Sequence, residues 1–355
     1  MNIGMMGGWN TDSGASFHTE LIGRTWRKKG HKLAVFTFYD YAFHGTQITG
    51  EDEEYVRRCF TVEGYDSPEF DPIPFLTEEY EIFVAEDLGM LPKDSLRKIF
   101  HHIRKRAKTV NVIHDGKLSQ NPSFYQFDWD AVVCFDERYR DFLVQAHEPS
   151  KLHLIPYPCY SGAEGDKLSA RKSLSLPVDE KIVLAFGPSS KAVLELLPSI
   201  EELSVDYPIS FLVVTKDQTA METLKNHTPS CPLHIELREE APNIDRLYDY
   251  LHASDALVFN KGSASHVVLS STAFQCLSSG CPIVARNSNY VECFDREVMK
   301  FDTPVQFKEA LRAIFDETEE YRITRKAAED YARRNSADAV AEKFISLFER
   351  LLKGE

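Results

Sequence analysis

The sequence predicts two doubly wound α/β domains in tandem, followed by helices towards the C-terminus. Short apolar runs alternate with stretches of helical periodicity through most of the 355 residues, which is typical of consecutive βαβ units. A glycine turn, Gly7-Gly8, separates the first apolar run from the first helical stretch. The alternation restarts after a proline- and glycine-rich stretch at 156–165, and this stretch therefore marks the boundary between the two domains.

The first domain is expected over residues 1–160. Its first helix is predicted by four apolar residues whose spacing places them on one face, namely Phe17, Leu21, Ile22 and Trp26. Strands are expected at 1–6, 32–38, 81–85, 109–113, 131–135 and 152–155, and further helices at 93–106 and 137–146.

The second domain is expected over residues 161–335, with a separate C-terminal segment at 336–355. Its strands are predicted at 182–186, 211–214, 234–237, 256–259 and 283–285, and the chain then continues as helices at 305–316, 318–334 and 337–353. Ligands of doubly wound sheets bind at the carboxyl ends of the strands. We therefore expect a ligand in a cleft at the carboxyl ends of both sheets.

Composition excludes several classes of function. The formal net charge of −14 argues against a nucleic-acid partner, because phosphate binding needs a dense positive surface. The longest apolar runs have five residues, far fewer than the roughly 20 of a membrane span. The seven scattered cysteines contain no Cys-x-x-Cys pair, which indicates reduced thiols without a metal site or disulfide framework. A cytoplasmic location is expected, and the oligomeric state stays open.

A basic cluster lies on the helix predicted at 93–106. Its cations are Arg97, Lys98, Arg104, Lys105, Arg106 and Lys108, and its apolar face carries Leu96, Ile99, Phe100 and Ile103. We expect this face to pack on the sheet, and weak contact with an anionic membrane surface is the alternative.

Several segments, in their order and spacing, resemble the retaining two-domain (GT-B) glycosyltransferases that include sucrose and glycogen synthases. The N-terminal match consists of Gly7-Gly8, Leu21 and the run Gly30-His31-Lys32-Leu33-Ala34-Val35. Ile155-Pro156 stands where these enzymes carry I-P-N-G. Ala253-Ser254-Asp255-Ala256 and the run from Phe274 to Val284 (FQCLSSGCPIV) are similar to their A-x-D and E-A-x-A-x-G-x-P-V blocks.

The resemblance implies a transferase of GT-B fold. Such an enzyme would move a sugar from a nucleotide-diphosphate donor to an unknown acceptor, which is a saccharide, a lipid-linked molecule or a protein. The reaction would be of retaining type and would need neither metal nor cofactor. The resemblance also implies that the helix within 336–355 crosses back onto the first domain.

Site residues follow from the matched positions. Ser270, Ser271 and Thr272 occupy the family's diphosphate-binding turn before a helical run, where backbone amides attract anions; capping of that helix is the alternative role. Lys191 is expected to bind the same diphosphate. His114 falls where the family places a histidine beside the transferred sugar, and its neutral imidazole is expected to hydrogen-bond there. Gly7, Gly8 and Asn10 are expected in the acceptor site, with Gly7-Gly8 allowing close backbone approach to a ligand; Phe38, Tyr39, Tyr41 and Phe43 either stack on a sugar or form core.

Departures from the family leave two alternatives. Val267 and Gln275 stand where the family has two glutamates, and no arginine accompanies Lys191. Gln275 can still hydrogen-bond a ribose, whereas Val267 cannot bind a sugar hydroxyl. A catalytically degenerate protein that binds a sugar or a partner is therefore the alternative, and another sugar-nucleotide enzyme such as an epimerase is a weaker one. Asp128-Trp129-Asp130 matches a metal-binding Asp-x-Asp motif but is interpreted as a turn.

Overall fold

A computed structural model describes the backbone of all residues except 12, 41–48, 163, 188–189 and 228–231, and the side chains of 190 and 191 are also not described. The chain divides into two compact units. Unit 1 contains Met1–Pro158, His266–Ser271 and Asn335–Glu355, and unit 2 contains Cys159–Ser265 and Thr272–Arg334. The expected boundaries were residues 160 and 335; the structure differs from them mainly by grouping the segment His266–Ser271 with unit 1.

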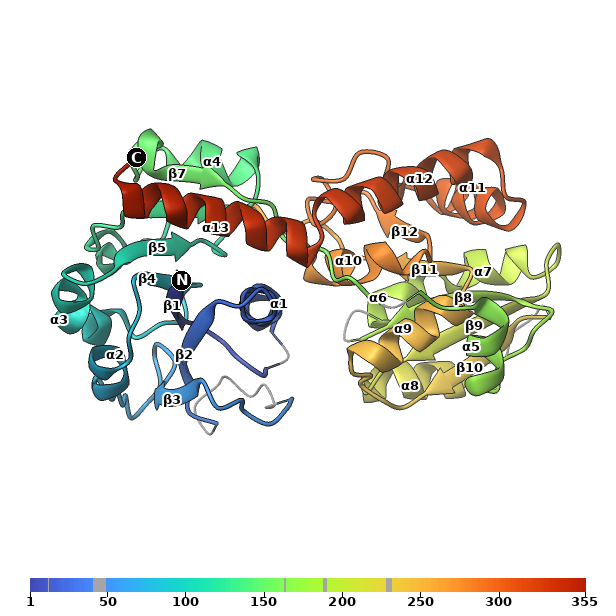
Figure 1. Cartoon of the computed structure of the whole chain (residues 1–355). Helices are drawn as coiled ribbons and strands as arrows, with labels where there is room; N and C mark the ends of the chain where they lie inside the picture. The colour runs from blue at the N-terminus through green and yellow to red at the C-terminus, as the bar shows by residue number, and fades with distance from the viewer. Residues whose placement is uncertain (12, 41–48, 163, 188–189, 228–231) are drawn as a thin grey trace. The chain divides into compact units, whose positions relative to one another are not determined.

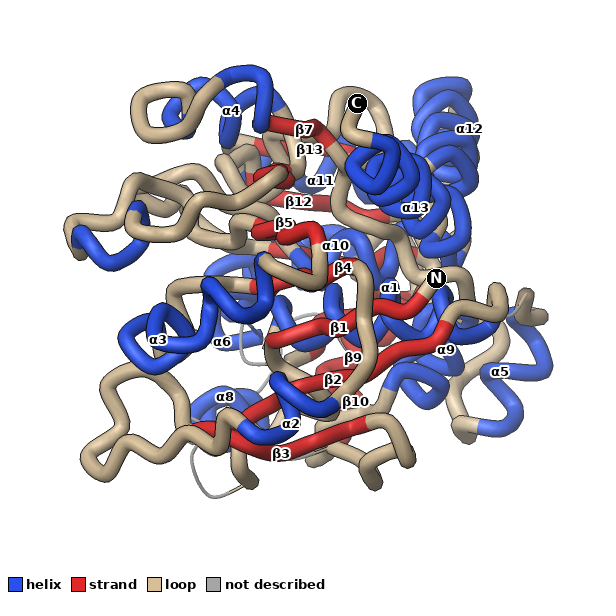
Figure 2. Tube along the Cα trace, turned by 60° about the vertical axis from the view of Figure 1, so that its left-hand side comes forward, coloured by secondary structure: helices blue, strands red, loops and turns tan. Residues whose placement is uncertain are grey.

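The described part of unit 1 contains a seven-stranded parallel sheet in the order β3-β2-β1-β4-β5-β6-β7. Figure 2 shows β3, β2, β1, β4 and β5 lying side by side in this order. The strands are β1 (Asn2–Met6), β2 (Lys32–Phe38), β3 (Val56–Phe60), β4 (Ile82–Glu86), β5 (Lys108–Val112), β6 (Ala131–Cys134) and β7 (Leu152–Leu154). The sequence pattern missed β3, because Arg57 and Arg58 interrupt its apolar run and pair with Glu78 and Asp52 at the edge of the sheet.

Helices α1 (Gly14–Lys28), α2 (Ile73–Thr77), α3 (Lys93–Arg104), α4 (Glu137–Leu143) and α13 (Ala337–Lys353) complete unit 1. The apolar face of α3 is buried, as expected, so only its charged face is left for a membrane surface. Near the C-terminus, α13 packs on α1 and lies beside β5 in Figure 1. The contact is built on Trp26, whose ring meets Phe344 and Phe348 and whose Nε1–H donates to the Ala341 carbonyl at 3.4 Å.

The described part of unit 2 contains a six-stranded parallel sheet in the order β10-β9-β8-β11-β12-β13. Its strands are β8 (Lys181–Phe186), β9 (Ile209–Val214), β10 (His234–Arg238), β11 (Ala256–Phe259), β12 (Ile283–Arg286) and β13 (Met299–Phe301). Its longer helices are α8 (Gln218–Lys225), α9 (Ile244–Ala253), α11 (Pro304–Phe315) and α12 (Glu319–Arg334), and the shorter ones are α5 (Lys167–Ser173), α6 (Ser190–Val193), α7 (Leu197–Leu203) and α10 (Ser271–Cys276). Ser271, which begins α10, is grouped with unit 1.

Most helices begin where the sequence supplies a capping side chain. An oxygen of the residue before the helix accepts a hydrogen bond from a backbone N–H in the first turn, which satisfies a donor that the helix itself leaves free. The capping residues are Ser13, Asp136, Asp166, Asp217, Asn243, Thr303 and Ser336.

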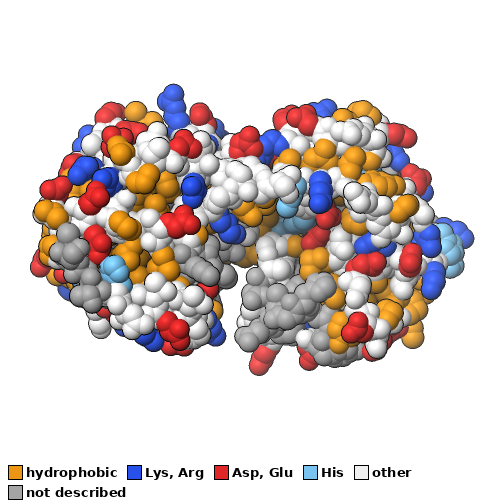
Figure 3. Space-filling view, turned by 180° about the vertical axis from the view of Figure 1, so that it is seen from behind, with side chains coloured by type: hydrophobic (Ala, Val, Ile, Leu, Met, Phe, Trp, Pro, Cys, Tyr) orange, Lys and Arg blue, Asp and Glu red, His pale blue; other side chains and the backbone are white. Residues whose placement is uncertain are grey.

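Each sheet reverses its strand order at one place. In unit 1 the order reverses between β1 and β4, and in unit 2 between β8 and β11. Ligands of doubly wound sheets bind at such points, outside the carboxyl ends of the strands. Acidic and basic side chains are interspersed over the face of each unit seen in Figure 3. No helix in the described part of the chain combines the length and the apolar character that crossing a bilayer requires.

Candidate functional site

Two histidines and a glutamate meet at the carboxyl end of the unit 1 sheet. Glu86 is the last residue of β4, His114 follows β5 by two residues, and His18 lies in α1. The Glu86 Oε2 atom is 3.0 Å from Nε2 of His114 and 3.1 Å from Nδ1 of His18. The side chains of His18 and Glu86 are completely buried, whereas that of His114 is 11% exposed. His114 is therefore the member of this cluster that a ligand can reach.

Glycine and aromatic residues set the position of the cluster. A Cβ on Gly7 would lie 2.8 Å from the Cβ of Glu86, and one on Gly8 would lie 3.2 Å from the Cβ of Ser16. The glycine turn thus lets the end of β1 approach both β4 and α1. On the other side, the ring of Phe135 packs against both histidines, with centroids 5.3 Å from His18 and 5.0 Å from His114.

The charges of the cluster form a buried ion pair. Burial raises the pKa of Glu86, but the charges and hydrogen bonds of His18 and His114 outweigh it and lower that pKa to about 2. Burial lowers the pKa of His114, and the hydrogen bond and charge of Glu86 raise it to a net value above the usual one. Burial lowers the pKa of His18. These shifts favour an ionised Glu86, and they widen the pH ranges in which His114 is protonated and His18 is neutral.

Two more carboxyl groups and a lysine surround this pair. Burial raises the pKa of Asp87 to about 6, and it also raises the pKa of Asp115. Lys93 is only 2% exposed, and its Nζ donates to the carbonyls of Leu88, Gly89 and Leu91 at 3.2–3.3 Å, which fixes the loop after β4. Such a concentration of shifted pKa values at the end of a sheet is typical of functional sites.

The same three residues are of the types that bind a transition metal. One ligand atom from each of His18, Glu86 and His114 lies within 4.8 Å of the others, and two imidazoles with a carboxylate suit Zn²⁺ or Fe²⁺. Histidine ligands of metals almost always donate their second ring nitrogen to an outer partner. Among the described residues, neither ring nitrogen of His18 nor Oε1 of Glu86 has a hydrogen-bond partner, and Nδ1 of His18 is only within ion-pair distance of Oε2. The described residues therefore supply no outer partner for a metal-bound His18.

A second set of polar groups lies at the carboxyl end of the unit 2 sheet. Asn260 and Lys261 directly follow β11, and the Nδ2–H of Asn260 donates to the Ala192 carbonyl at 2.6 Å. Its Oδ1 is buried and has no hydrogen-bond partner among the described residues. The Lys261 Nζ lies 4.7 Å from the ring centre of Tyr290, and burial lowers the pKa of Lys261. In the described part of the chain, no carboxylate forms an ion pair with this lysine, which leaves its charge for an anion.

Comparison with known proteins decides the fold. No family model matches the sequence. Solved structures match over the whole chain: a glycosyltransferase from Rickettsia africae has a TM-score of 0.71 at 13% identity, covering 100% of this chain and 99% of that one. Sucrose-phosphate synthase from Thermosynechococcus elongatus has a TM-score of 0.68 at 13% identity, with 100% of both chains covered. A pneumococcal O-GlcNAc transferase in complex with UDP and GlcNAc has a TM-score of 0.65 at 12% identity, with 99% of both covered.

The chain has the GT-B fold. Its two parallel sheets are the two Rossmann-like domains expected of that fold. The expected C-terminal helix is also present, since α13 packs on α1 within unit 1.

Of the residues predicted in the N-terminal half of this GT-B chain, Gly7, Gly8 and His114 all lie at the carboxyl end of the unit 1 sheet. Asn10 lies next to them with φ of 53° and is 2% exposed. Its amide already has partners: Nδ2–H donates to the Glu51 carbonyl at 3.1 Å, and Oδ1 accepts from Arg24 at 2.6 Å. The role of Asn10 in acceptor binding stays a prediction. In the structure its side-chain amide holds the loop at 51–52 by hydrogen bonds.

The predicted diphosphate turn lies where α10 begins. Ser270 is buried, and Ser271, Thr272 and Gln275 belong to α10. The carbonyl of Gln275 accepts a hydrogen bond from the Tyr248 hydroxyl at 2.8 Å. Lys191 lies in α6, and its side chain is outside the described part of the structure, as are Tyr41 and Phe43. Phe38 is a buried core residue that packs on Phe60.

Asp128 and Asp130 have structural partners at the opposite end of the unit 1 sheet. Asp128 pairs with Arg104 at 2.5 Å and Lys151 at 2.7 Å. Asp130 accepts from the backbone N–H and the hydroxyl of Thr109 at 2.8 and 2.9 Å. Both carboxylates thus connect the segment before β6 to neighbouring parts of unit 1. These contacts agree with the interpretation of the motif as a turn.

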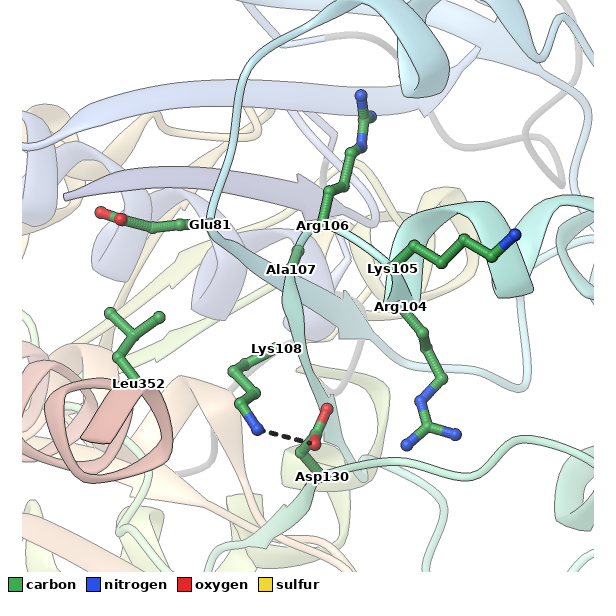
Figure 4. A pocket seen from close by; sticks show the side chains of 8 residues that line it. All are labelled: Glu81, Arg104, Lys105, Arg106, Ala107, Lys108, Asp130 and Leu352. Carbon is green, nitrogen blue, oxygen red and sulfur yellow. Dashed lines mark ion pairs between the residues drawn. The ribbon is translucent and has the colours of Figure 1, made fainter. Parts of the chain in front are cut away.

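A pocket of about 400 Å³ also lies at this opposite end, beside the first residue of β5. Its lining includes Arg104, Lys105, Arg106 and Lys108. The side chains of Arg104, Lys105 and Arg106 diverge in Figure 4, whereas Lys108 lies 3.6 Å from Asp130. Because these cations do not converge, the pocket is a poor anion site.

Proposed function

We propose that the chain transfers a sugar from a nucleotide-diphosphate donor to an acceptor, without a metal ion and with retention of configuration. The observation that carries this proposal is the GT-B fold over the whole chain, with polar groups at the switch point of each sheet. Solved neighbours of the same fold include the O-GlcNAc transferase with UDP and GlcNAc and an Escherichia coli protein bound to UDP-2-fluoro glucose. The resemblance of the sequence motifs supports the same reaction class.

In this proposal the nucleotide contacts residues of unit 2 together with Ser270 and Ser271, which are grouped with unit 1. The turn Ser270-Ser271-Thr272 contacts the diphosphate at the start of α10, and Gln275 contacts the ribose. Lys191 and Lys261 supply positive charge, since Lys261 has no carboxylate partner among the described residues. The missing arginine of the family is thereby offset by a cation at the end of β11. Charged donors make stronger hydrogen bonds to phosphate than neutral ones.

Unit 1 contributes the sugar and acceptor side of the reaction. His114 hydrogen-bonds the transferred sugar, and the Gly7-Gly8 turn lets the ligand approach the backbone closely. The rate enhancement comes from positioning and from stabilisation of the leaving diphosphate, because these are the terms that fixed dipoles and cations supply.

Calorimetric titration with a panel of nucleoside diphosphates tests the donor site. We expect one nucleotide to bind, and Lys261→Met to weaken it by about tenfold, equivalent to 1.4 kcal/mol. Lys216→Met is the matched control, because Lys216 is exposed and follows β9 of the same sheet. Absence of binding to every nucleotide would contradict the proposal.

A binding protein without turnover is the second candidate, and it is favoured by Val267 and Gln275 in place of the two family glutamates. It predicts nucleotide binding, but no release of nucleoside diphosphate from a bound nucleotide sugar in the presence of candidate acceptors. Measurement of nucleoside diphosphate release separates the two candidates.

A further inference from the structure

We propose that Glu86 is a positioning residue for His114. It binds the Nε2–H of the imidazole, so that Nδ1 is the ring atom offered to an oxygen of the transferred sugar. This inference rests on the proposed transferase function and adds a role that sequence motifs do not assign.

The geometry leaves His114 one free nitrogen. Nε2 is 3.0 Å from Oε2 of the completely buried Glu86, so the opposite ring atom, Nδ1, points away from the carboxylate. Among the described residues no group hydrogen-bonds to Nδ1. Because His114 is the partly exposed member of the cluster, this nitrogen is the one that a ligand can meet. A histidine held by one nitrogen and used through the other is a common arrangement in catalysis.

The carboxylate itself is fixed from two further directions. His18 places Nδ1 3.1 Å from the same Oε2 atom, and Gly7 packs where any Cβ would come within 2.8 Å of the Cβ of Glu86. The Cβ of Glu86 thus has little room to move, and Oε2 faces both histidines, whereas Oε1 has no hydrogen-bond partner among the described residues. An orienting group must be rigid to fix a base or donor within a few tenths of an ångström, and this one is held by a strand, a helix and a turn.

The buried negative charge also decides the protonation of His114. An anion 3.0 Å away in a site screened from water favours the imidazolium form, and the pKa of His114 is raised accordingly. The raised pKa extends the pH range in which His114 is protonated. The protonated ring offers Nδ1–H as a donor to a hydroxyl or phosphoryl oxygen, and this donor is lost as the pH rises through that pKa. The sequence-based expectation was a neutral imidazole. The titratable groups around it are His18, Glu86, Asp87, Lys93, Asp115 and His266.

The first experiment is an NMR titration of the histidine ring protons, with His114 assigned by its absence in His114→Asn. In Glu86→Gln, which keeps the size of the side chain but removes its charge, we expect His114 to titrate at a lower pH than in the wild type. Glu81→Gln is the matched control, because Glu81 is exposed and directly precedes the other end of β4. It should leave the titration of His114 unchanged.

The second experiment is the pH dependence of turnover. Glu86→Gln is expected to lower kcat by about tenfold or more, as is usual for loss of a proton donor in its correct state, with little change in KM for the nucleotide sugar. The fall in kcat at high pH should begin at a lower pH than in the wild type. Glu86→Asp keeps the charge and should restore part of the His114 shift.

Two results would overturn the inference. One is an unchanged titration of His114 in Glu86→Gln, or in Glu86→Ala should the glutamine variant not fold. The other is stoichiometric Zn²⁺ binding by the wild type that Glu86→Gln abolishes, which would make the cluster a metal site. Failure of every nucleotide to bind would instead contradict the transferase proposal and leave the NMR result to decide the role of Glu86.

Discussion

Replacing Gly7 by alanine tests whether the end of β1 must approach β4 as closely as the structure indicates. The new Cβ would lie 2.8 Å from the Cβ of Glu86 and 3.4 Å from Oγ1 of Thr19. Ordinary carbon contacts are about 3.5–4.0 Å apart, so the strand ends must separate by several tenths of an ångström. Glu86 is buried and held by two histidines, and it cannot move aside without breaking those contacts. Overpacking of this kind costs about 1–3 kcal/mol.

Urea and thermal unfolding measure this cost. For a domain of 150–250 residues, each kcal/mol lowers Tm by about 2–4 °C, so we expect Gly7→Ala to melt roughly 2–12 °C below the wild type. Gly50→Ala is the control in the same unit, because its Cβ would come no nearer than 3.6 Å to any atom of the described residues. If Gly7→Ala and Gly50→Ala melt together, the close approach of β1 to β4 is wrong, and so is the fixed position of Glu86.

Three further predictions concern charge and metal. Ser271→Asp keeps an acceptable helix start but places negative charge against the donor phosphates. Calorimetry should show nucleotide affinity reduced by at least about tenfold, and the melting temperature should hardly change. Unchanged affinity would mean that the turn only caps the helix. Asp87→Asn should stabilise the protein above pH 6 and not below about pH 4. A buried carboxyl whose pKa is raised to about 6 destabilises the fold only at pH values where that carboxyl ionises. Unfolding in urea at pH 4 and pH 7 checks the sign, and equal effects at the two pH values would contradict it. Nucleotide-sugar turnover should survive EDTA, and strict dependence on Mn²⁺ or Mg²⁺ would direct attention back to Asp128 and Asp130.

The alternation of apolar runs was enough to predict both sheets, because buried parallel strands are apolar over their whole length. It failed at β3 and at β13, which are both edge strands. Arg57 and Arg58 of β3 pair with acidic residues of unit 1, and β13 has only three residues, of which Lys300 is charged. Edge strands need not be apolar on both faces, so hydrophobicity alone does not reveal them.

The cluster around His114 could be predicted only in part. His114 was predicted because it falls where the resembling family places a histidine. It also follows a strand, and Glu86 obeys that rule too, since it directly follows the apolar run 82–85. A search for every polar residue at a strand end would also have found Asn260 and Lys261. His18 gave no such signal: it lies within a helix, and only the packing of α1 on the sheet brings its ring to Glu86. Spacing along the chain does not report contacts that tertiary packing creates.

The contact between α1 and α13 has a consequence for synthesis. The indole N–H of Trp26 donates a hydrogen bond to the carbonyl of Ala341, which lies 315 residues later in the chain. At about 5–20 residues per second, the ribosome needs roughly 15 to 60 s to reach that partner after Trp26 has been made. During this time the face of α1 that α13 will cover is open to other chains and to chaperones. All of unit 2 is therefore translated before unit 1 receives its last segment, Asn335–Glu355.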